Sequence, residues 1–559
     1  MNSTEPLTAI IFHQTEATMN ENVLKKYPRA IFHMRAQHRK KQFGLVLGAG
    51  TSSQFGFPRW EELLDKIAST LPDLQEIDKS NSPSFAQCLF RSFLNQQIEK
   101  EGNSRDPLSP ANIVRIKAEW TRLVKDKLYD NVPEEINELK EKCTYLDEFV
   151  EIIKKTRLTI NYNFDDSIQR LLNDRRDETE KQETRGYRTD WRTDPQIYPQ
   201  NAVIYHPNGY LPKHTGEKPS DSIVLLDDAF GDQLIESMAG KYIYLLNHYA
   251  QTTCLFVGLS LTDPTLQSIL RRNAITHPGH VHYYLKRLKG SQATKTQGTI
   301  VEANFETYNL ITLYLEESEF SELAKLILME DGEFAELCER VAVPNRYIYY
   351  LVGCVAAGKS TTTSFFRSLS IHDEWIERMP KDMNKDPSLV NPESVTEIDD
   401  FVASQWKKKN QALKKSKYEL LVVDRCHLDA FAFTHPEKWH EKAQFLYEKL
   451  SLADLNNSIE KGMVIFLKNE PRALHARAII GLRETDEEKL ASQQQLLYEC
   501  YSSDKDCGFI CIDTFGMSRN DVAKEVARII HIKEYQEYDL QNRLNTLRER
   551  PNHDNTPEN

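Results

Sequence analysis

The feature that most constrains this chain is an apolar run that ends in a glycine-rich loop. The run Tyr347-Ile-Tyr-Tyr-Leu-Val leads directly into Gly353-Cys-Val-Ala-Ala-Gly358-Lys359-Ser360-Thr361. This order predicts a buried strand, a loop of the Gly-x-x-x-x-Gly-Lys-Ser type and a helix, which we expect from Thr361 to Leu369. A strand, loop and helix in this order are typical of an α/β domain.

The residues of this loop predict a nucleotide-phosphate site. The glycines let backbone N–H groups face phosphate oxygens, and the following helix offers its positive end. Lys359 can reach the outer phosphates, and Ser360 can hold Mg²⁺. We therefore expect ATP or another nucleotide with Mg²⁺, bound with or without catalysis, at Gly353, Gly358, Lys359, Ser360 and Thr361.

The composition is that of an ordinary globular chain. Its 559 residues, 40% hydrophobic and 28% charged, can form sizeable cores in roughly two to four domains. A net charge of -12 argues against a protein that coats nucleic acid or an anionic membrane. The N-terminus has no basic start before an apolar core, and no long apolar segment follows. We expect a cytoplasmic protein without a membrane or a stable nucleic-acid partner.

The nine cysteines are scattered along the chain and include no Cys-x-x-Cys pair. Such a pair usually begins a tetrahedral zinc site, so we expect no zinc. Cysteines that are odd in number and lie mostly in apolar surroundings are typical of reduced thiols in a cytosolic protein.

A second glycine turn lies near the start of the chain. Residues 1–40 are expected to be a solvated lead-in that ends in a basic run. Phe43-Gly-Leu-Val-Leu47 predicts a buried strand, Gly48-Ala49-Gly50-Thr51-Ser52 a tight turn, and Trp60 to Ala68 an amphipathic helix. After a first strand, such a turn lets the pyrophosphate of a dinucleotide approach the backbone.

Three further motifs follow in order. They are Leu158-Thr-Ile-Asn161-Tyr-Asn163-Phe-Asp165, Ile204-Tyr-His206-Pro-Asn208-Gly209 and Leu255-Phe-Val-Gly258-Leu-Ser260-Leu-Thr-Asp263. Together with the glycine turn they resemble the sirtuin superfamily, most closely its zinc-free bacterial branch in antiphage defence. The resemblance implies NAD binding by Gly48, Ala49, Gly50, Ser52, Gly258, Ser260 and Asp263, and catalysis by Asn161, His206, Asn208 and Asp165.

Cleavage of the nicotinamide–ribose bond produces an oxocarbenium-like sugar, so the site needs a positioned water and a base near the ribose hydroxyls. Asn161 is our candidate for holding water and ribose, and His206 is the candidate base. Asn163 stands where the superfamily usually has an acid, and Asn208 stands where it has a histidine. Either His206 has taken over the role of base, or the site binds NAD without cleaving it efficiently.

The back part has an acid at the end of another strand. Tyr418-Glu-Leu-Leu-Val-Val predicts a buried strand that ends at Asp424-Arg425. Asp424 can orient Mg²⁺ or take a proton from the acceptor, and Arg425 can clamp a phosphate or form a structural salt bridge. Asp424-Arg425-Cys-His-Leu-Asp429 resembles thymidylate kinase and the deoxynucleoside kinases, as does Arg378-Met-Pro380.

The same resemblance extends to the region after the strand predicted at Val464-Ile-Phe-Leu467. Asn469-Glu-Pro-Arg-Ala-Leu-His-Ala-Arg477 is similar to the segment that leads into a kinase lid. The resemblance implies that Arg477 and Arg483 close over the transferred phosphoryl group. A solvated basic helix face explains these arginines equally well.

The remaining segments complete two doubly wound parallel α/β domains. Ser82 to Phe149 is expected to be a helical insertion, and the charged stretch from Asn173 to Pro195 a surface loop. Further strands are expected at Ser222–Leu226, Gly279–Leu285 and Phe509–Ile512, and helices at Phe320–Leu328, Asp331–Pro344 and Val522–Ile530. We divide the chain into a lead-in (1–40), a sirtuin-like domain (41–335), a connector (336–346), a P-loop nucleotide-kinase-like domain (347–540) and a polar tail (541–559).

The two resemblances together favour an NAD⁺ hydrolase of antiphage defence. Its first domain would stay silent until the second detects a nucleotide or a phage-derived trigger, and a homo-oligomer is expected. The alternative is an active deoxynucleotide or nucleoside kinase with an NAD-binding regulatory domain. An NAD-dependent protein deacylase and a non-catalytic assembly protein are minor alternatives.

Overall fold

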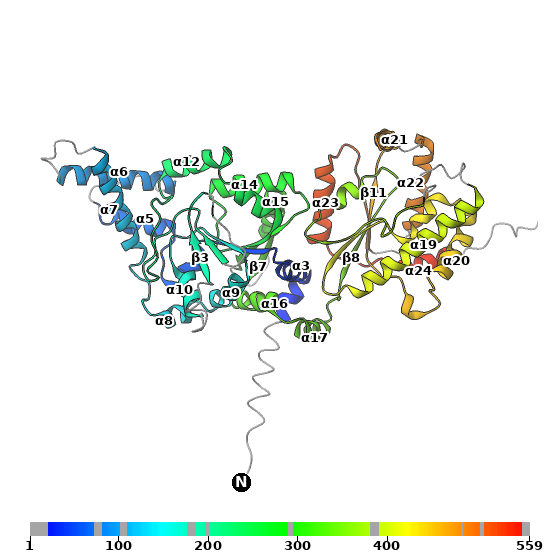
Figure 1. The fold of residues 1–559 in the computed structure, drawn as a ribbon, viewed down its shortest axis with the longest axis horizontal. Helices are drawn as coiled ribbons and strands as arrows, with labels where there is room; N and C mark the ends of the chain where they lie inside the picture. Colours follow the sequence, from blue (N-terminus) through cyan, green and yellow to red (C-terminus); the bar gives the residue numbers. More distant parts are fainter. Residues whose placement is uncertain are drawn as a thin grey trace, which may run out of the picture. The chain divides into compact units, whose positions relative to one another are not determined.

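The computed structural model describes residues 21–71, 81–100, 109–175, 186–193, 195, 202–288, 295–380, 391–481, 485–502 and 508–549 (Figure 1). The chain divides into two compact units. The first comprises Met1–Ala274 and Val281–Leu337, and the second comprises Ile275–His280 and Cys338–Asn559. Each unit is built on one parallel sheet, so the predicted class of two parallel α/β domains is confirmed.

The first unit contains a seven-stranded sheet in the order β3-β4-β2-β1-β5-β6-β7. Its central strand β1 (Phe43–Leu47) has the predicted bounds and is buried along its whole length. Apolar side chains on both faces suit a strand of a parallel sheet, because both faces are covered. The other strands are β2 (Leu158–Asn161), β3 (Tyr187–Asp190), β4 (Ala202–Tyr205), β5 (Thr253–Val257), β6 (His282–Arg287) and β7 (Leu310–Leu315).

The helices of the first unit include α5 (Trp60–Ala68), which has the predicted bounds. The predicted helical insertion is also confirmed, since it contains α6 (Ser82–Lys100), α7 (Pro110–Leu128), α8 (Ile136–Lys142) and α9 (Thr144–Lys155). The remaining helices are α2 (Glu21–Lys26), α3 (Pro28–Arg39), α4 (Ala49–Ser52), α10 (Ser167–Asp174), α12 (Asp227–Met238), α13 (Ile243–Gln251), α14 (Pro264–Thr276), α15 (Lys295–Tyr308) and α16 (Glu317–Leu328).

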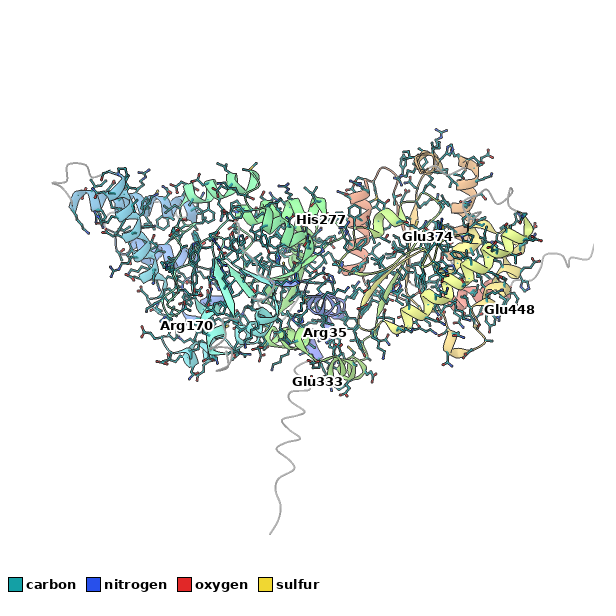
Figure 2. The ribbon with its side chains drawn as sticks, viewed as in Figure 1. Arg35, Arg170, His277, Glu333, Glu374 and Glu448 are labelled. Atoms are coloured by element: carbon teal, nitrogen blue, oxygen red, sulfur yellow. The ribbon has the colours of Figure 1, made fainter. Side chains whose placement is uncertain are left out.

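The segment before β1 is not the solvated lead-in that we expected. Helix α3 buries apolar side chains such as Ile31 and Phe32, and it packs against α16. Arg35 of α3, labelled in Figure 2, donates hydrogen bonds to the carbonyls of Leu326 and Met329 at the end of α16. The basic run is only the end of an amphipathic helix, and the apolar residues before it form the buried face of that helix.

Two short segments of the first unit also differ from prediction. Ser222 to Leu226 forms no strand, although Leu225 is buried and the N–H of Val224 donates to the carbonyl of Asn208 at 2.8 Å. A short apolar run can be buried in a loop, so periodicity alone did not decide this case. In contrast, the charged stretch predicted as a loop contains β3, an edge strand that pairs only with β4.

The second unit contains a five-stranded sheet in the order β12-β11-β8-β10-β9. The strands predicted from four apolar runs are present as β8 (Tyr347–Val352), β10 (Leu420–Asp424), β11 (Met463–Lys468) and β12 (Phe509–Asp513), and β9 (Ser370–His372) completes the sheet. The helices are α17 (Asp331–Val341), α18 (Lys359–Thr363), α19 (Pro392–Lys415), α20 (Trp439–Lys449), α21 (Pro471–Ile480), α22 (Glu487–Tyr501), α23 (Arg519–His531) and α24 (Leu540–Arg548). The chain passes from the first unit to the second within α17.

Two expectations for the second unit are wrong. The helix predicted from Thr361 to Leu369 ends at Thr363, after which Phe365 and Phe366 bond to the carbonyls three residues before them. Three consecutive threonines disfavour the α-helix because β-branched side chains lose rotamer freedom there. The expected polar tail begins with α24, which packs on α20 and buries Leu540, Leu544 and Leu547.

Within the described parts of the chain, no helix has both the length and the apolar composition needed to cross a membrane.

Candidate functional site

The first unit has its topological switch point beside β1. From β1 the chain continues to β2 on one side of the sheet, and it later returns to β5 on the other side. In such sheets, ligands bind in the crevice outside the carboxyl ends of the strands. The predicted motifs follow the carboxyl ends of β1, β2, β4 and β5, so the fold brings them to this one edge.

The glycine turn after β1 is pressed against the loop after β5. The N–H of Gly50 donates to the carbonyl of Gly258 at 2.8 Å. A Cβ on Gly50 would lie 2.8 Å from the Cα of Gly258, and a Cβ on Gly258, whose φ is +71°, would lie 2.5 Å from the nitrogen of Thr51. Only glycine fits both positions, which is the cradle that a phosphate needs to approach backbone N–H groups.

Asn163 fastens this turn to the end of β2. Its Nδ2 donates to the carbonyl of Gly48 at 3.1 Å and lies 3.2 Å from Thr51 Oγ1 and 3.3 Å from Ser52 Oγ. The Ser52 hydroxyl in turn bonds to the Asp165 carboxylate. A carboxylate at position 163 would face the Gly48 carbonyl without a proton to donate, so this contact requires the amide. The sequence marked Asn163 only as a departure from the superfamily.

The Asn161 amide has one satisfied atom and one unsatisfied atom. Its side chain is fully buried at the end of β2, and its Oδ1 accepts a hydrogen bond from the N–H of Asn163 at 3.1 Å. Its Nδ2 is buried and has no hydrogen-bond partner among the residues that the structure describes. A buried donor without a partner is rare in proteins and points to a water or a ligand.

His206 is fully buried, and both of its ring nitrogens have partners. Nδ1 lies 2.7 Å from the carbonyl of Asn163, and Nε2 lies 2.9 Å from the side-chain nitrogen of Gln169. The carbonyl can only accept, so Nδ1 carries the proton and Nε2 accepts from Gln169. Burial lowers the pKa of His206 to about 4. This geometry makes His206 a positioning residue and disfavours its predicted role as base.

Asn208 and Asp263 meet at the crevice. The Asn208 side chain lies close enough to the Asp263 carboxylate to lower its pKa, against the larger effect of burial, and Asn208 Oδ1 accepts from Gln233 at 3.3 Å. Asp263 Oδ1 also accepts from the N–H of Leu266 at 2.9 Å, in the first turn of α14. Burial raises the pKa of Asp263. The contact joins the residue that replaces the expected histidine to a partly exposed carboxylate.

The other predicted residues of this unit lie around these contacts. Asp165 is buried and accepts from both the N–H and the hydroxyl of Ser167, and burial raises its pKa. Ser260 is exposed and shares a hydrogen bond with Thr262 at 2.7 Å, and Ala49 is exposed. Sequence reasoning missed Gln169 and Gln233, because each lies on a helix without a motif. Only the structure shows that these two glutamines donate hydrogen bonds to buried groups of the site.

The arrangement fits the dinucleotide that the motifs implied. The glycine cradle offers N–H groups to a pyrophosphate, and Asn161 offers a buried donor. Among the described residues no group of three or more His, Cys, Asp or Glu side chains could hold a metal ion.

The phosphate loop of the second unit follows β8. Gly353 has a φ of +151°, and a Cβ there would lie 2.7 Å from the carbonyl of Leu467. Gly358 has a φ of +96° and open space around its Cα, while Ala356 adopts a left-handed φ of +62°. The loop therefore contains three residues with positive φ, Gly353, Ala356 and Gly358, a conformation that their small size permits.

Lys359 lies inside this loop. Its Nζ donates to the carbonyls of Gly353 at 2.8 Å and Cys354 at 2.9 Å, and its side chain is buried. Burial, together with the nearby Arg425, lowers the pKa of Lys359 to about 8. The ammonium group is thus held at the loop, where a phosphate would replace the two carbonyls as its partner.

Ser360 and Asp424 form the pair that a Mg²⁺ site needs. The Ser360 hydroxyl donates to Asp424 Oδ2 at 2.8 Å. Asp424 Oδ1 is buried and has no hydrogen-bond partner in the described part of the chain, and burial raises the pKa of this carboxyl. A hydroxyl and a free carboxylate oxygen are hard ligands that suit Mg²⁺, so these residues fit the ion implied by the motif.

Arg425 forms ion pairs within the second unit. Its Nε lies 2.5 Å from Glu374 and its guanidinium 3.6 Å from Asp429, whose other oxygen accepts from Tyr501 at 2.7 Å. Lys409 of α19 donates to the carbonyl of Asp424 at 2.9 Å. Sequence reasoning missed Glu374, Lys409 and Tyr501, which come from segments without a motif. Here the structural salt bridge that we considered for Arg425 is present.

Of the two predicted lid residues, Arg477 makes no hydrogen bond or ion pair with the phosphate loop among the described residues. Arg477 is exposed on α21, and its guanidinium has no hydrogen-bond or ion-pair partner among the described residues. Thr361 is also exposed, and Arg483 lies outside the described residues. The close contacts of this site therefore come from the loop after β8 and the start of α18, from the end of β10, from Glu374 after β9 and from α19.

Comparison with known proteins identifies one part of the chain. Residues 157–311 match the SIR2-like domain family, from just before β2 into β7. No curated protein matches the chain. This segment is similar to the SIR2-like domain family, and the similarity implies NAD binding.

Solved structures of nucleotide kinases also match. A thymidylate kinase from Candida albicans is 15% identical, covering 35% of this chain and 98% of its own, with a TM-score of 0.25. A deoxyadenosine kinase from M. mycoides with bound dATP is 19% identical, covering 32% and 96%, with a TM-score of 0.26. The same enzyme with dCMP and a flexible dCDP is 20% identical, covering 36% and 99%, with a TM-score of 0.26.

Proposed function

We propose that the first unit is an NAD⁺ hydrolase that cleaves the nicotinamide–ribose bond. The observation that carries this proposal is the buried, unpartnered Nδ2 of Asn161 at the switch point of a SIR2-like domain. Leaving such a donor unpaired costs about 1 to 3 kcal/mol, which a bound ribose hydroxyl or water would recover. Because Oδ1 is held by the N–H of Asn163, the donor is oriented before the substrate arrives.

In this proposal each group at the crevice has one task. The cradle of Gly48, Gly50 and Gly258 binds the pyrophosphate through backbone N–H groups. Asn161 orients the attacking water against the sugar face opposite nicotinamide. Asn163 and His206 hold the cradle and the strand ends in place, since Asn163 bonds to both the Gly48 carbonyl and the His206 ring.

We assign the proton-accepting role to Asp263 instead of His206. His206 would have to break its contact with Gln169 to accept a proton, and its lowered pKa makes it a weak base. Asp166 is fully buried and holds three backbone N–H groups of the loop after β4. Asp263 is partly exposed, and burial raises its pKa, which makes its carboxylate a better proton acceptor.

The second unit acts in this proposal as the nucleotide sensor. Support comes from the Ser360–Asp424 pair and from Lys359, which together fit a nucleotide phosphate with Mg²⁺. Ligand binding would have to favour the active arrangement by about 5.5 kcal/mol to switch activity from 1% to 99%. The role in antiphage defence, through depletion of host NAD⁺ by a homo-oligomer triggered by infection, rests on the resemblance to the zinc-free branch.

The test is NAD⁺ consumption by the purified full-length chain. Nicotinamide and ADP-ribose are quantified with Mg²⁺ and a panel of NTPs, dNTPs and dNMPs. We expect cleavage with a particular nucleotide and at least about a 100-fold loss in Asn161→Asp. This variant keeps the oxygen that bonds to Asn163 but lacks the N–H donor, so it separates chemistry from the turn contact. Asp263→Asn keeps the contact to Leu266 and is expected to lower kcat by about 100-fold.

Two outcomes would contradict the proposal. Intact NAD⁺ under every condition would remove the hydrolase assignment. Unchanged cleavage in Asn161→Asp would show that the unpaired donor has no part in the reaction. Unchanged cleavage in Asp263→Asn would remove only the assignment of the base.

A second candidate function is a deoxynucleotide or nucleoside kinase. The free Asp424 Oδ1 favours it, because this atom could orient Mg²⁺ or accept a proton from an acceptor hydroxyl. In the same assay a kinase would accumulate phosphorylated nucleotide, and Lys359→Ala would abolish it. If instead Lys359→Ala only alters which nucleotide triggers NAD⁺ cleavage, the sensor role stands.

A further inference from the structure

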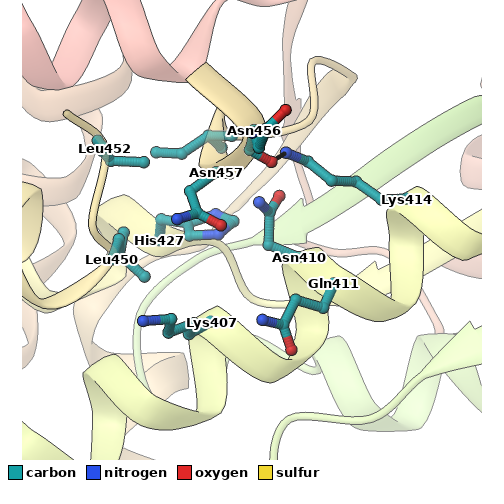
Figure 3. Close-up of a pocket in the computed structure, with 10 residues that line it drawn as sticks. Lys407, Asn410, Gln411, Lys414, His427, Leu450, Leu452, Asn456 and Asn457 are labelled. Carbon is teal, nitrogen blue, oxygen red and sulfur yellow. Dashed lines mark hydrogen bonds between the residues drawn. The ribbon is translucent and has the colours of Figure 1, made fainter. Parts of the chain in front are cut away.

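A small polar cavity in the second unit lies apart from the phosphate loop. It has a volume of about 30 Å³ and lies between α19 and the loop of residues 450–459 (Figure 3). This space holds about two water molecules, or one tetrahedral oxyanion, and it cannot enclose a nucleoside, so the rest of a phosphomonoester would lie outside it. Figure 3 shows His427 beside the amide of Asn457, with Lys407 and Gln411 projecting from α19.

His427 is a buried imidazole whose hydrogen bonds are all unmade. Its side chain is 1% exposed, and within the described segments neither Nδ1 nor Nε2 has a hydrogen-bond partner. The adjacent Trp406, with ring centroids 5.0 Å apart, also has a buried and unpartnered indole N–H. Burial lowers the pKa of His427 to about 3, so the neutral ring offers one donor and one acceptor. Such orphaned groups require a partner that the chain does not supply.

The charge around the cavity has one sign. Lys407 and Lys414 line it, and none of the lining residues is a carboxylate. Lys407 donates to the hydroxyl of Ser451 at 3.0 Å, and Lys414 donates to the carbonyl of Asn456 at 2.6 Å. Neither lysine has a carboxylate partner among the described residues. Two unneutralised cations beside an orphaned donor favour an anion in the cavity.

We propose that this cavity binds the phosphoryl group of inorganic phosphate or of a phosphomonoester. A hydrogen phosphate supplies both things that His427 lacks: oxygens that accept from its N–H and from the lysines, and one O–H that donates to its other nitrogen. The bound group would contact the turn that follows Asp424, since His427 is three residues further along the chain. Helix α19 also contacts both ends of this turn, because Lys409 donates to the Asp424 carbonyl and Trp406 packs on the His427 ring. The proposal does not depend on NAD⁺ hydrolysis.

Phosphate binding to the full-length chain tests the proposal. Equilibrium dialysis with radiolabelled inorganic phosphate is done on the wild type and on Lys359→Ala, because phosphate can also occupy the loop after β8. We expect Lys359→Ala to keep phosphate binding at the cavity while losing binding at the loop after β8. Adding Lys407→Gln and Lys414→Gln should raise the Kd for phosphate at the cavity by more than about tenfold, since two charge-assisted contacts are removed. Lys415→Gln is the matched control, because this exposed lysine neighbours Lys414 and does not line the cavity.

Competition distinguishes the two sources of the phosphoryl group. A nucleoside 5′-monophosphate that displaces phosphate at lower concentration assigns the site to a nucleotide, and weaker displacement assigns it to free phosphate. Sulfate has no proton for the imidazole and should bind at least several-fold more weakly. Loss of all phosphate binding in Lys359→Ala, or unchanged binding in the Lys407 and Lys414 double variant, would overturn the proposal.

Discussion

At the scale of single residues, hydrogen-bond partners separate side chains with a structural task from those available for chemistry. His206 and Asn161 follow the ends of neighbouring strands, and both were candidates for the reaction. His206 has a partner at each ring nitrogen, whereas Asn161 has a buried donor without one. In the second unit the same contrast distinguishes Arg425, which is held by Glu374, from Asp424, which has a free oxygen.

His206 should make the stability of the first unit depend on pH. Burial lowers its pKa from 6.5 to about 4. Below pH 6.5 the unfolded chain binds a proton that the folded chain does not, so the free energy of unfolding falls as the pH is lowered towards 4. Between pH 7 and pH 5 this loss amounts to about 2 kcal/mol.

Urea unfolding of the first unit at both pH values measures this effect. His206→Gln should remove about 2 kcal/mol of the pH dependence. His435→Gln, at an exposed position, should leave it unchanged. An equal pH dependence in wild type and His206→Gln would contradict the assignment.

At the scale of elements, contacts between distant segments decide which helices belong to the core. Helix α3 was expected to be part of a solvated lead-in, yet its buried Arg35 satisfies carbonyls at the end of α16. The last carbonyls of a helix have no intrahelical partner, so a buried helix end needs such a donor. The glycine cradle is likewise a contact between two elements, the turn after β1 and the loop after β5.

Arg35→Met should destabilise the first unit much more than Arg39→Met. Both arginines bond to Asp331, but Arg35 is 2% exposed and Arg39 is 37% exposed. Removing Arg35 leaves buried carbonyls without a donor and should lower the free energy of unfolding by about 3 kcal/mol. Loss of the exposed pair should cost less than about 1 kcal/mol. Chemical denaturation of the two variants measures the difference, and equal losses would refute this role for Arg35.

Gly258→Ala should damage the NAD site directly. The new methyl group would lie 2.5 Å from the nitrogen of Thr51, at a φ of +71°. We expect NAD⁺ binding, measured by calorimetry, to fall by at least about tenfold as the cradle opens. Gly298→Ala on α15 is the control, because a Cβ there meets open space. That variant should keep NAD⁺ binding and gain up to about 1 kcal/mol of stability, so equal effects of the two would argue against the cradle.

At the scale of the whole molecule, the chain carries two separate parallel sheets, each with a candidate ligand site at the carboxyl ends of its central strands. In the first unit the site lies between β1 and β5, and in the second it lies between β8 and β10. If the first unit hydrolyses NAD⁺ and the second senses a nucleotide, a mutation that disables one site should leave ligand binding at the other intact.

Each ligand should therefore stabilise the protein through its own site. A ligand at 100 times its Kd adds about 2.7 kcal/mol to the unit that binds it. We expect NAD⁺ to raise the unfolding temperature of wild type and Lys359→Ala, but to raise it much less in Gly258→Ala. Mg²⁺ with the triggering nucleotide should show the opposite pattern, as measured by differential scanning calorimetry. Loss of both shifts in one variant would contradict two independent binding sites.

The sequence alone determined the strands of both sheets that carry motifs, the phosphate loop and the class of the fold. These features depend on local patterns: apolar runs for buried strands, and glycines where the backbone must turn tightly. The family resemblance grouped the motif segments into one site in each unit, and the parallel sheets bring those strand ends to one edge.

Only the tertiary structure decided what each side chain at those edges can do. Gln169 bonds to His206 and disfavours its predicted role as base, Asn208 lies beside Asp263, and Lys409 donates to the Asp424 carbonyl from a helix without a motif. Burial and hydrogen-bond partners decide the pKa of a side chain and which of its donors and acceptors stay unpaired. The burying residues and the partners are distant in sequence. A local pattern cannot contain that information, so it predicted the candidate site residues but not their contacts.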